Sequence, residues 1–134
     1  MPKYPDCFPA DLEKRVIEEK HASFSVRENS YRILRCGVLD RDAFLSTFED
    51  QEKRGVRKPD RHPTLSSYST SCFNNIDGAA NILNFSFRNE PRASIAVGTI
   101  FPQCGPSTDP NQNGHIDWWI YEDASPEKDF KEVS

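Results

Sequence analysis

The stretch ASIAVGTIF, residues 93–101, contains the strongest β-strand signal in the sequence. β-branched and aromatic residues fill most of it, and no proline or charged residue interrupts it. Just before it, residues 74–87 place apolar side chains at helical spacing: Ile76, Ala79, Ala80, Leu83 and Phe87. The two stretches together predict a β-sheet with a helix packed against it.

The chain on either side continues this combination of strands and helices. Three further stretches have the composition of strands: residues 30–39, 67–73 and 115–122. Two amphipathic stretches predict helices over residues 10–24 and 40–55, with Asp40 as the N-cap of the second. A short closing helix is expected over residues 125–133.

This order predicts one α+β domain, residues 1–134, in which a small mixed or split β-sheet is flanked by helices. A parallel α/β sheet stays an alternative, because the sequence does not reveal the order of the strands. Residues 102–114 are rich in Pro, Gly, Asn and Asp, and they predict a long exposed loop before the last strand.

The composition is that of an ordinary folded protein, with 36% hydrophobic and 28% charged residues. The net charge of -4, with acidic and basic residues interleaved, disfavours general nucleic-acid binding. No stretch approaches the roughly 18 apolar residues that span a bilayer, and the first residues form no apolar signal segment. We therefore expect a cytoplasmic protein that does not enter membranes.

The 4 cysteines are widely spaced and contain no C-x-x-C pair, so we expect reduced thiols and no metal site.

Polar side chains interrupt three of the predicted strands: Tyr31 with Arg32, then Ser69, Thr70 and Ser71, then His115 with Asp117. A buried guanidinium requires an anionic partner, because an unpaired charge in a core costs several kcal/mol. A purely structural interpretation pairs Arg32 with Asp117, leaves Ser69 and Ser71 facing solvent, and packs Thr70 in the core.

These three interruptions resemble the three-part signature of the ADP-ribosyltransferase fold, in the class whose members use Arg, Ser-Thr-Ser and Glu. The resemblance runs from Ser30 to Glu122 and includes a helix after each of the first two strands. It implies that NAD is the substrate and that Arg32, with Tyr31 beside it, contacts the phosphates or the adenosine ribose. It also implies that Ser69 to Ser71 support the nicotinamide pocket.

The acidic position departs from the family pattern. The usual Glu-x-Glu is replaced by His115-Ile116-Asp117, or its role falls on Glu122, so the candidate catalytic residues are Asp117, Glu122 and His115. In the family this carboxylate holds the nicotinamide ribose and stabilises positive charge as the glycosidic bond breaks. Because Asp is one methylene shorter than Glu, a displacement of about 1 Å is expected to slow catalysis on the order of a hundredfold.

Two functions follow as hypotheses. The first is an NAD-binding enzyme that transfers ADP-ribose to an unknown acceptor, which could be a protein, or cleaves NAD. The alternative is a non-catalytic nucleotide- or protein-binding module on the same scaffold, including an inhibitor from a mobile element. Its binding surface would be the loop of residues 102–114 and whichever of Trp118 and Trp119 is exposed, since adjacent strand residues point to opposite faces.

Overall fold

Strand β1 (Arg27–Leu34) lies at the centre of a five-stranded sheet. Its neighbours are β2 (Thr70–Phe73) and β3 (Ser94–Ile100), and the edges are β4 (His115–Trp118) and β5 (Phe130–Glu132). The order across the sheet is β4-β2-β1-β3-β5. These elements come from a computed structural model that describes residues 2–57 and 62–133; residues 1, 58–61 and 134 of the expected domain lie outside the described residues.

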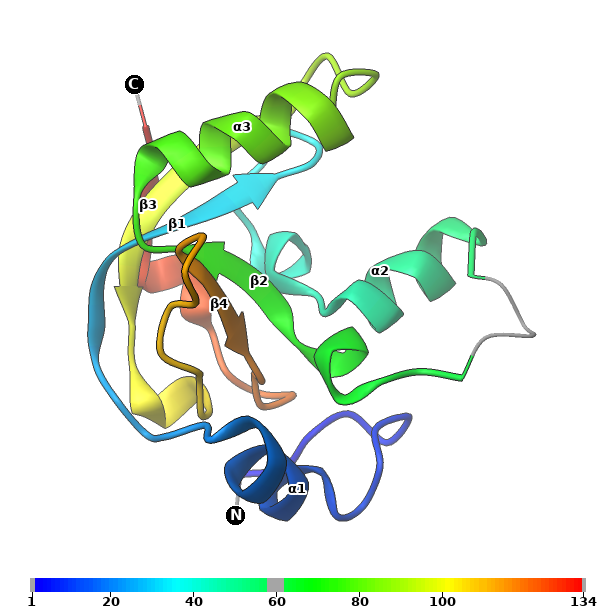
Figure 1. Ribbon diagram of the computed structural model, residues 1–134. Coiled ribbons are helices and arrows are strands. Elements are labelled where there is room, and N and C mark those ends of the chain that lie inside the picture. The colour runs from blue at the N-terminus through cyan, green and yellow to red at the C-terminus, as the bar shows by residue number, and fades with distance from the viewer. Residues whose placement is uncertain (1, 58–61, 134) are drawn as a thin grey trace.

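Each strand pairing is antiparallel, so the parallel α/β alternative is wrong and the α+β class is confirmed. Helix α3 (Ile76–Ser86) lies along one face of the sheet, while α1 (Leu12–Lys20) and α2 (Thr47–Arg54) lie at its periphery (Figure 1). The helices and the sheet form the single domain expected from the sequence. The strands form a single antiparallel sheet, so the detail of a mixed or split sheet is wrong.

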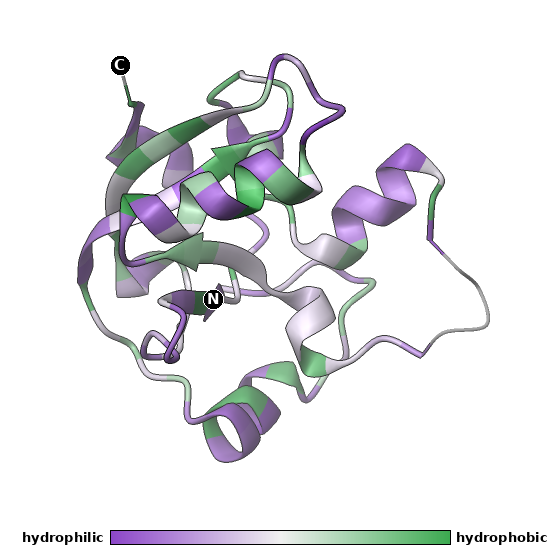
Figure 2. Cartoon of the chain, turned by 45° about the horizontal axis from the view of Figure 1, so that its top comes forward, coloured by the Kyte–Doolittle hydropathy of each residue, from purple (hydrophilic) through white to green (hydrophobic). Residues whose placement is uncertain are grey.

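The two faces of the sheet have separate apolar clusters. Under α3, Ala79 packs with Ile33 of β1 and Phe73 of β2. The opposite face holds the larger cluster, in which the rings of Phe44 and Phe130 lie 4.9 Å apart between centroids. Figure 2 shows the difference between the helices: hydrophobic residues recur along α3, whereas α2 is almost entirely hydrophilic. None of the residues of α2 is buried.

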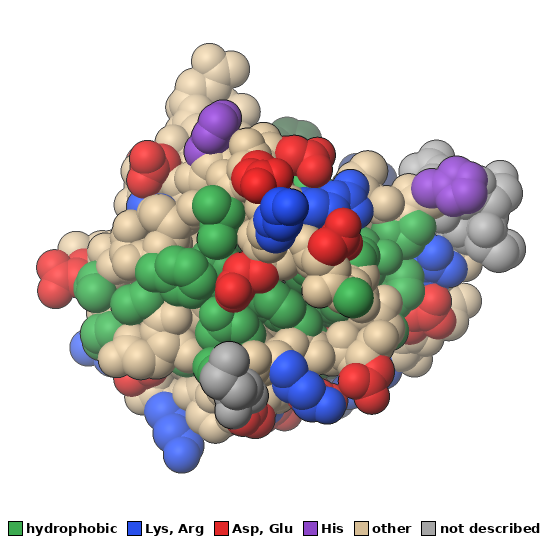
Figure 3. All heavy atoms as spheres, turned by 90° about the horizontal axis from the view of Figure 1, so that it is seen from below, with side chains coloured by type: hydrophobic (Ala, Val, Ile, Leu, Met, Phe, Trp, Pro, Cys, Tyr) green, Lys and Arg blue, Asp and Glu red, His purple; other side chains and the backbone are tan. Residues whose placement is uncertain are grey.

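Helix α1 closes one end of the molecule over a third cluster, in which Leu12 and Val16 pack with Trp119. Seen from that end, hydrophobic side chains run across the surface between scattered acidic and basic ones (Figure 3). The expectation that one tryptophan is exposed is wrong, because Trp118 and Trp119 are 1% and 0% exposed. Their indole N–H groups donate to the carbonyls of Gly105 and Leu65, so neither ring is free to stack on a ligand.

The strand predicted over residues 30–39 begins at Arg27 and ends at Leu34. It stops there because the chain turns at Gly37, whose φ of +70° suits glycine and where an added Cβ would lie 2.3 Å from the carbonyl oxygen of Arg92. The strand predicted over residues 67–73 likewise starts only at Thr70, after a 3₁₀ turn, Leu65–Tyr68.

The helix predicted over residues 40–55 is divided in two. Asp40 is an N-cap as expected, but it caps a 3₁₀ turn, Arg41–Phe44. Ser46 then starts α2 with a capping box, since its hydroxyl accepts from the Glu49 N–H and the Glu49 carboxylate accepts from the Ser46 N–H. The second cap redirects the chain, so that α2 projects beside β1 and β2.

The C-terminal part departs most from expectation. The strand predicted over residues 115–122 ends at Trp118, because the N–H of Trp119 turns away to the carbonyl of Pro106. The closing helix is only a 3₁₀ turn, Pro126–Asp129, and it is followed by β5, which the sequence analysis does not foresee.

The loop of residues 102–114 is less exposed than predicted. It opens with a 3₁₀ turn, Pro102–Cys104, and its residues 104–107 are buried. Arg27 holds it, donating from Nε to the Ser107 hydroxyl at 2.7 Å and from its NH1 to Asp109 at 2.9 Å. Backbone hydrogen bonds to Asp117 and His115 cover the outer edge of β4 with this loop, so its exposed residues are Gln103 and residues 109–113. In the part of the chain that the structure describes, no helix combines the length and the apolar character needed to cross a membrane.

Candidate functional site

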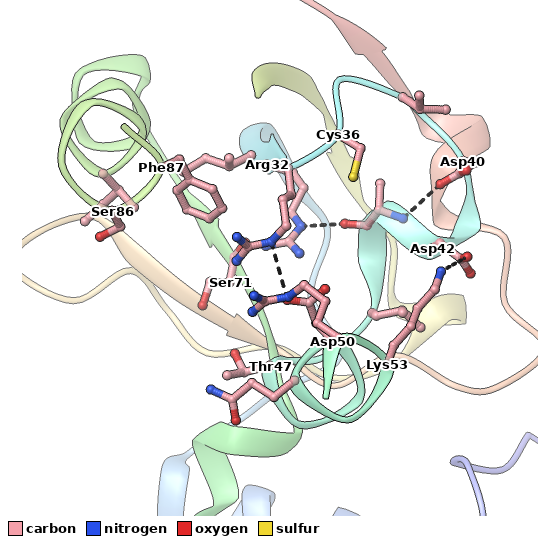
Figure 4. Close-up of a pocket in the computed structure, with 18 of the residues that line it drawn as sticks. Arg32, Cys36, Asp40, Asp42, Thr47, Asp50, Lys53, Ser71, Ser86 and Phe87 are labelled. Carbon is pink, nitrogen blue, oxygen red and sulfur yellow. Dashed lines mark hydrogen bonds and ion pairs between the residues drawn. The ribbon is translucent and has the colours of Figure 1, made fainter. Parts of the chain in front are cut away.

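A pocket opens where β1 and β2 diverge. Among the described residues, these two strands are in register at a single pair, Tyr31 and Phe73, and beyond it they separate. A pocket of about 860 Å³ lies there, lined by residues of α3 on one side and by residues of α2 and the preceding turn on the other (Figure 4). Arg32, Ser71 and His115 all line it.

Arg32 is one of the residues that line the pocket (Figure 4). Its Nε donates to the carbonyl of Ala43 at 2.9 Å and its NH1 to the carbonyl of Ser71 at 3.0 Å. No carboxylate in the described part of the chain lies within ion-pair distance of this guanidinium, so the structural pairing with Asp117 does not form. Burial, with the nearby Arg35 guanidinium as a smaller cause, lowers the pKa of Arg32.

Ser71 and His115 are joined across β2 and β4 by a 2.9 Å hydrogen bond between Oγ and Nε2. The same Nε2 lies 3.8 Å from an oxygen of Asp117. In a catalytic triad the carboxylate binds the ring nitrogen opposite the one that faces the serine. Both contacts here use one nitrogen, so these residues do not form a serine-hydrolase triad.

Asp117 lies beside the pocket but does not line it. One carboxylate oxygen accepts from the Ser69 hydroxyl at 2.8 Å and the other from the Ser66 hydroxyl at 3.2 Å. Asp117 is the direct cross-strand partner of Ser71 in the β2–β4 pairing, and Ser71 lines the pocket. The Asp117 carboxylate is therefore next to a residue of the pocket wall. Ser66 is missed by the sequence analysis, since it belongs to a turn outside the Ser-Thr-Ser strand.

The other predicted site residues lie elsewhere. Tyr31 points to the opposite face of β1 from Arg32 and packs in the cluster under α3. Thr70 is buried and donates its hydroxyl to the carbonyl of Phe44 at 2.7 Å, and Ser69 is also buried rather than solvent-facing. Glu122 follows the end of β4 and pairs with Lys3 at 3.4 Å. The structure therefore brings together Arg32, Ser71 and His115, with Asp117 adjacent.

The pocket also contains a group of ion pairs that the sequence analysis does not predict as part of the site. Arg35, at the end of β1, lies 3.5 Å from Asp50 of α2 and 3.1 Å from Glu90 beyond α3. Arg54 binds the same oxygen of Asp50 at 3.0 Å. The signal in the sequence is a second arginine in a largely apolar strand, but nothing in the sequence places α2 opposite that strand.

Other groups that could carry chemistry are the cysteines and the side chains that could bind a metal ion. Cys72 is buried, and burial raises the pKa of its thiol to about 12; Cys104 is also buried and its pKa is raised for the same reason. Cys36 is exposed and lines the pocket. Within residues 2–57 and 62–133, no three His, Cys, Asp or Glu side chains gather as a metal ion would require.

Comparison with protein-family models, curated protein sequences and solved structures gives no significant match. The functional argument therefore depends on the pocket itself. It is lined by Arg32, which has no carboxylate partner among the described residues, and by the hydrogen-bonded pair Ser71 and His115, with the Asp117 carboxylate next to Ser71.

Proposed function

We propose that this protein binds NAD in the pocket between β1 and β2, and that it transfers ADP-ribose from NAD to an acceptor or hydrolyses NAD. The observation that carries the proposal is Arg32, a guanidinium with five donors of which two bind backbone carbonyls and none binds a described carboxylate. A phosphate group supplies the missing charge, and the planar guanidinium matches its oxygens well. The pocket volume of about 860 Å³ lies within the usual range for ligand sites.

The chemistry assigned to this site is cleavage of the bond between the ribose and the nicotinamide nitrogen. The nicotinamide leaves with the bonding electron pair, positive charge develops on the ribose, and water or an acceptor group then attacks that carbon and loses a proton. Asp117 is the carboxylate best placed to stabilise the charge, because Ser69 and Ser66 fix it beside Ser71. Glu122 is the weaker candidate, since it pairs with Lys3 outside the pocket.

A second candidate is a non-catalytic module that binds a nucleotide in the same pocket. The observation that favours it is that serine hydroxyls occupy both oxygens of Asp117, outside the pocket lining. In this case Arg32 still binds phosphate, but the ligand is not cleaved. Both candidates suit the cytoplasm, where the free cysteines Cys7 and Cys36 stay reduced.

The test measures NAD binding and nicotinamide release in the wild type, Arg32→Lys, Arg32→Ala and Asp117→Asn, with Arg88→Ala as the control. Arg88 is exposed and lies outside the pocket lining. Loss of a charged hydrogen bond predicts that Arg32→Ala weakens NAD binding by roughly 10- to 100-fold, with Arg32→Lys between it and the wild type. Arg88→Ala leaves binding unchanged.

Nicotinamide release that disappears in Asp117→Asn, with NAD still bound, supports the transferase or hydrolase. NAD binding without release in the wild type supports the non-catalytic module. If the wild type does not bind NAD, or if Arg32→Ala binds it as tightly while remaining folded by thermal melting, the proposal is wrong.

A further inference from the structure

We infer that Asp50 is an internal counter-ion that occupies a second anion position of the pocket, and that the second phosphate of a bound dinucleotide replaces it between Arg35 and Arg54. The inference rests on the proposed function, since it assumes that the pocket binds a ligand with two linked phosphates. It adds a second phosphate position and a residue that competes for it.

The geometry shows one carboxylate oxygen shared between two cations. Oδ2 of Asp50 lies 3.5 Å from Nε of Arg35 and 3.0 Å from Nε of Arg54. All three side chains line the same pocket as Arg32. Two guanidinium groups that converge on one anionic oxygen can bind a phosphate oxygen in the same way. Arg32 provides the open anion position and these two arginines provide the occupied one.

Asp50 can leave this position at low cost. It belongs to α2, which buries none of its residues and is hydrophilic apart from Phe48 (Figure 2). The side chains of Asp50 and Arg54 are 29% and 35% exposed, and ion pairs at such exposure contribute little stability. The Asp50 carboxylate can therefore rotate toward solvent without disturbing the core.

Arg35 stays in place when Asp50 leaves, because two other contacts hold it. Its NH1 binds Glu90 at 3.1 Å, and its guanidinium lies 4.5 Å from the centre of the Phe87 ring. The cation is thus already oriented for an incoming phosphate. A ligand with one phosphate is satisfied by Arg32 alone, whereas a pyrophosphate gains the second position and must compete with Asp50 for it.

The test uses inorganic pyrophosphate and inorganic phosphate as probes, measured by calorimetry on the wild type, Asp50→Asn and Asp42→Asn. Asp42 is the matched control, since it lines the same pocket and its loss changes the charge equally, but within residues 2–57 and 62–133 its ion-pair partner is Lys53 alone. We expect Asp50→Asn to tighten pyrophosphate binding by roughly 3- to 10-fold and to change phosphate binding less than about twofold. Asp42→Asn should change both by less than about twofold.

Arg54→Gln gives a second measurement on a partly exposed residue whose loss spares the core, and we expect it to weaken pyrophosphate binding by roughly the same factor.

The inference is overturned if Asp50→Asn affects both probes equally, matches Asp42→Asn, or weakens pyrophosphate binding, or if Arg54→Gln has no effect. A wild type that binds NAD and needs Arg32, but fails these comparisons, leaves the proposed function standing and removes only the role of Asp50. A wild type that does not bind NAD removes the proposed function itself.

Discussion

Glu13 shows how a single side chain ties the N-terminal segment to the body of the protein. Its Oε1 accepts hydrogen bonds from the phenols of Tyr4, at 3.1 Å, and Tyr121, at 2.6 Å. The two tyrosines lie at opposite ends of the sequence, and their ring centroids are 5.0 Å apart. Burial and the Glu13 carboxylate raise the pKa of both phenols, because the ionised form would lose solvation and face a negative charge.

These raised pKa values predict that the protein loses stability in alkaline solution. Below about pH 10 the phenols are neutral in both the folded and the unfolded chain, so they add no pH dependence. Above about pH 10 only the unfolded chain ionises readily, and the free energy of unfolding falls, on the order of 1 kcal/mol between pH 10 and pH 11. Urea unfolding over this range checks the effect.

The double variant Tyr4→Phe, Tyr121→Phe provides the control for the alkaline effect. It removes both ionising groups and keeps the aromatic packing, so its free energy of unfolding should fall less over the same pH range. An equally steep fall in the double variant would show that other groups cause the loss.

At the scale of elements, β5 depends on a close approach between backbones. Gly98 of β3 pairs with Phe130 of β5, and a Cβ added at Gly98 would lie 2.2 Å from the carbonyl oxygen of Asp129. Backbone atoms cannot yield as a flexible side chain would. The glycine therefore sets the distance at which the last strand joins the sheet.

We predict that Gly98→Ala destabilises the protein by about 1–3 kcal/mol, the usual cost of overpacking, and loosens β5 first. Urea unfolding gives the free energy, and hydrogen exchange of the amides in Phe130–Glu132 reports the strand. Gly78→Ala is the control, since the nearest atom to its added Cβ would be Oδ1 of the Asn75 side chain at 3.3 Å, a close contact that a small side-chain shift relieves. Its change should stay within about 1 kcal/mol. Equal effects of the two substitutions would contradict the role assigned to Gly98.

The elements also show what the sequence can and cannot predict. Helix α3 and strand β3 were predictable because their apolar spacing and their residue types agree. The end of β4 was not predictable, because Trp118 to Tyr121 have the composition of one continuous strand. The chain leaves the sheet after Trp118, where backbone N–H groups donate to carbonyls of the preceding loop. Strand β5 was missed because its Pro-Glu-Lys-Asp approach has helical propensity, and only the pairing with β3 makes the following residues a strand.

At the scale of the whole molecule, the pocket combines segments that the sequence keeps far apart. Arg32, Ser71 and His115 could be proposed from the sequence, because each is a polar residue in an otherwise apolar strand. The ion pairs of Arg35 with Asp50 and Glu90 could not, since they depend on where two helices lie relative to β1. Local patterns identify unusual residues, whereas the tertiary fold determines which of them meet.

A ligand that binds only the assembled pocket must stabilise the whole protein. We predict that NAD at about 100 times its dissociation constant raises the free energy of unfolding by about 2.7 kcal/mol. Thermal melting with and without NAD measures this as a higher Tm. The same concentration of NAD should leave the Tm of Arg32→Ala nearly unchanged, and an equal rise in that variant would place the ligand elsewhere.

The strand order β4-β2-β1-β3-β5 has a consequence for how the chain folds. The long ladders join β1 to β3 and β2 to β4, so no tight hairpin between consecutive strands can start the sheet. Such non-local pairing predicts slow folding, in the range of milliseconds to seconds. During synthesis, residues 27–34 must wait for residues 94–100 to emerge before they gain their main partner. Because His115 lines the pocket, the pocket is completed only when residues 115–118 have also emerged and paired with β2.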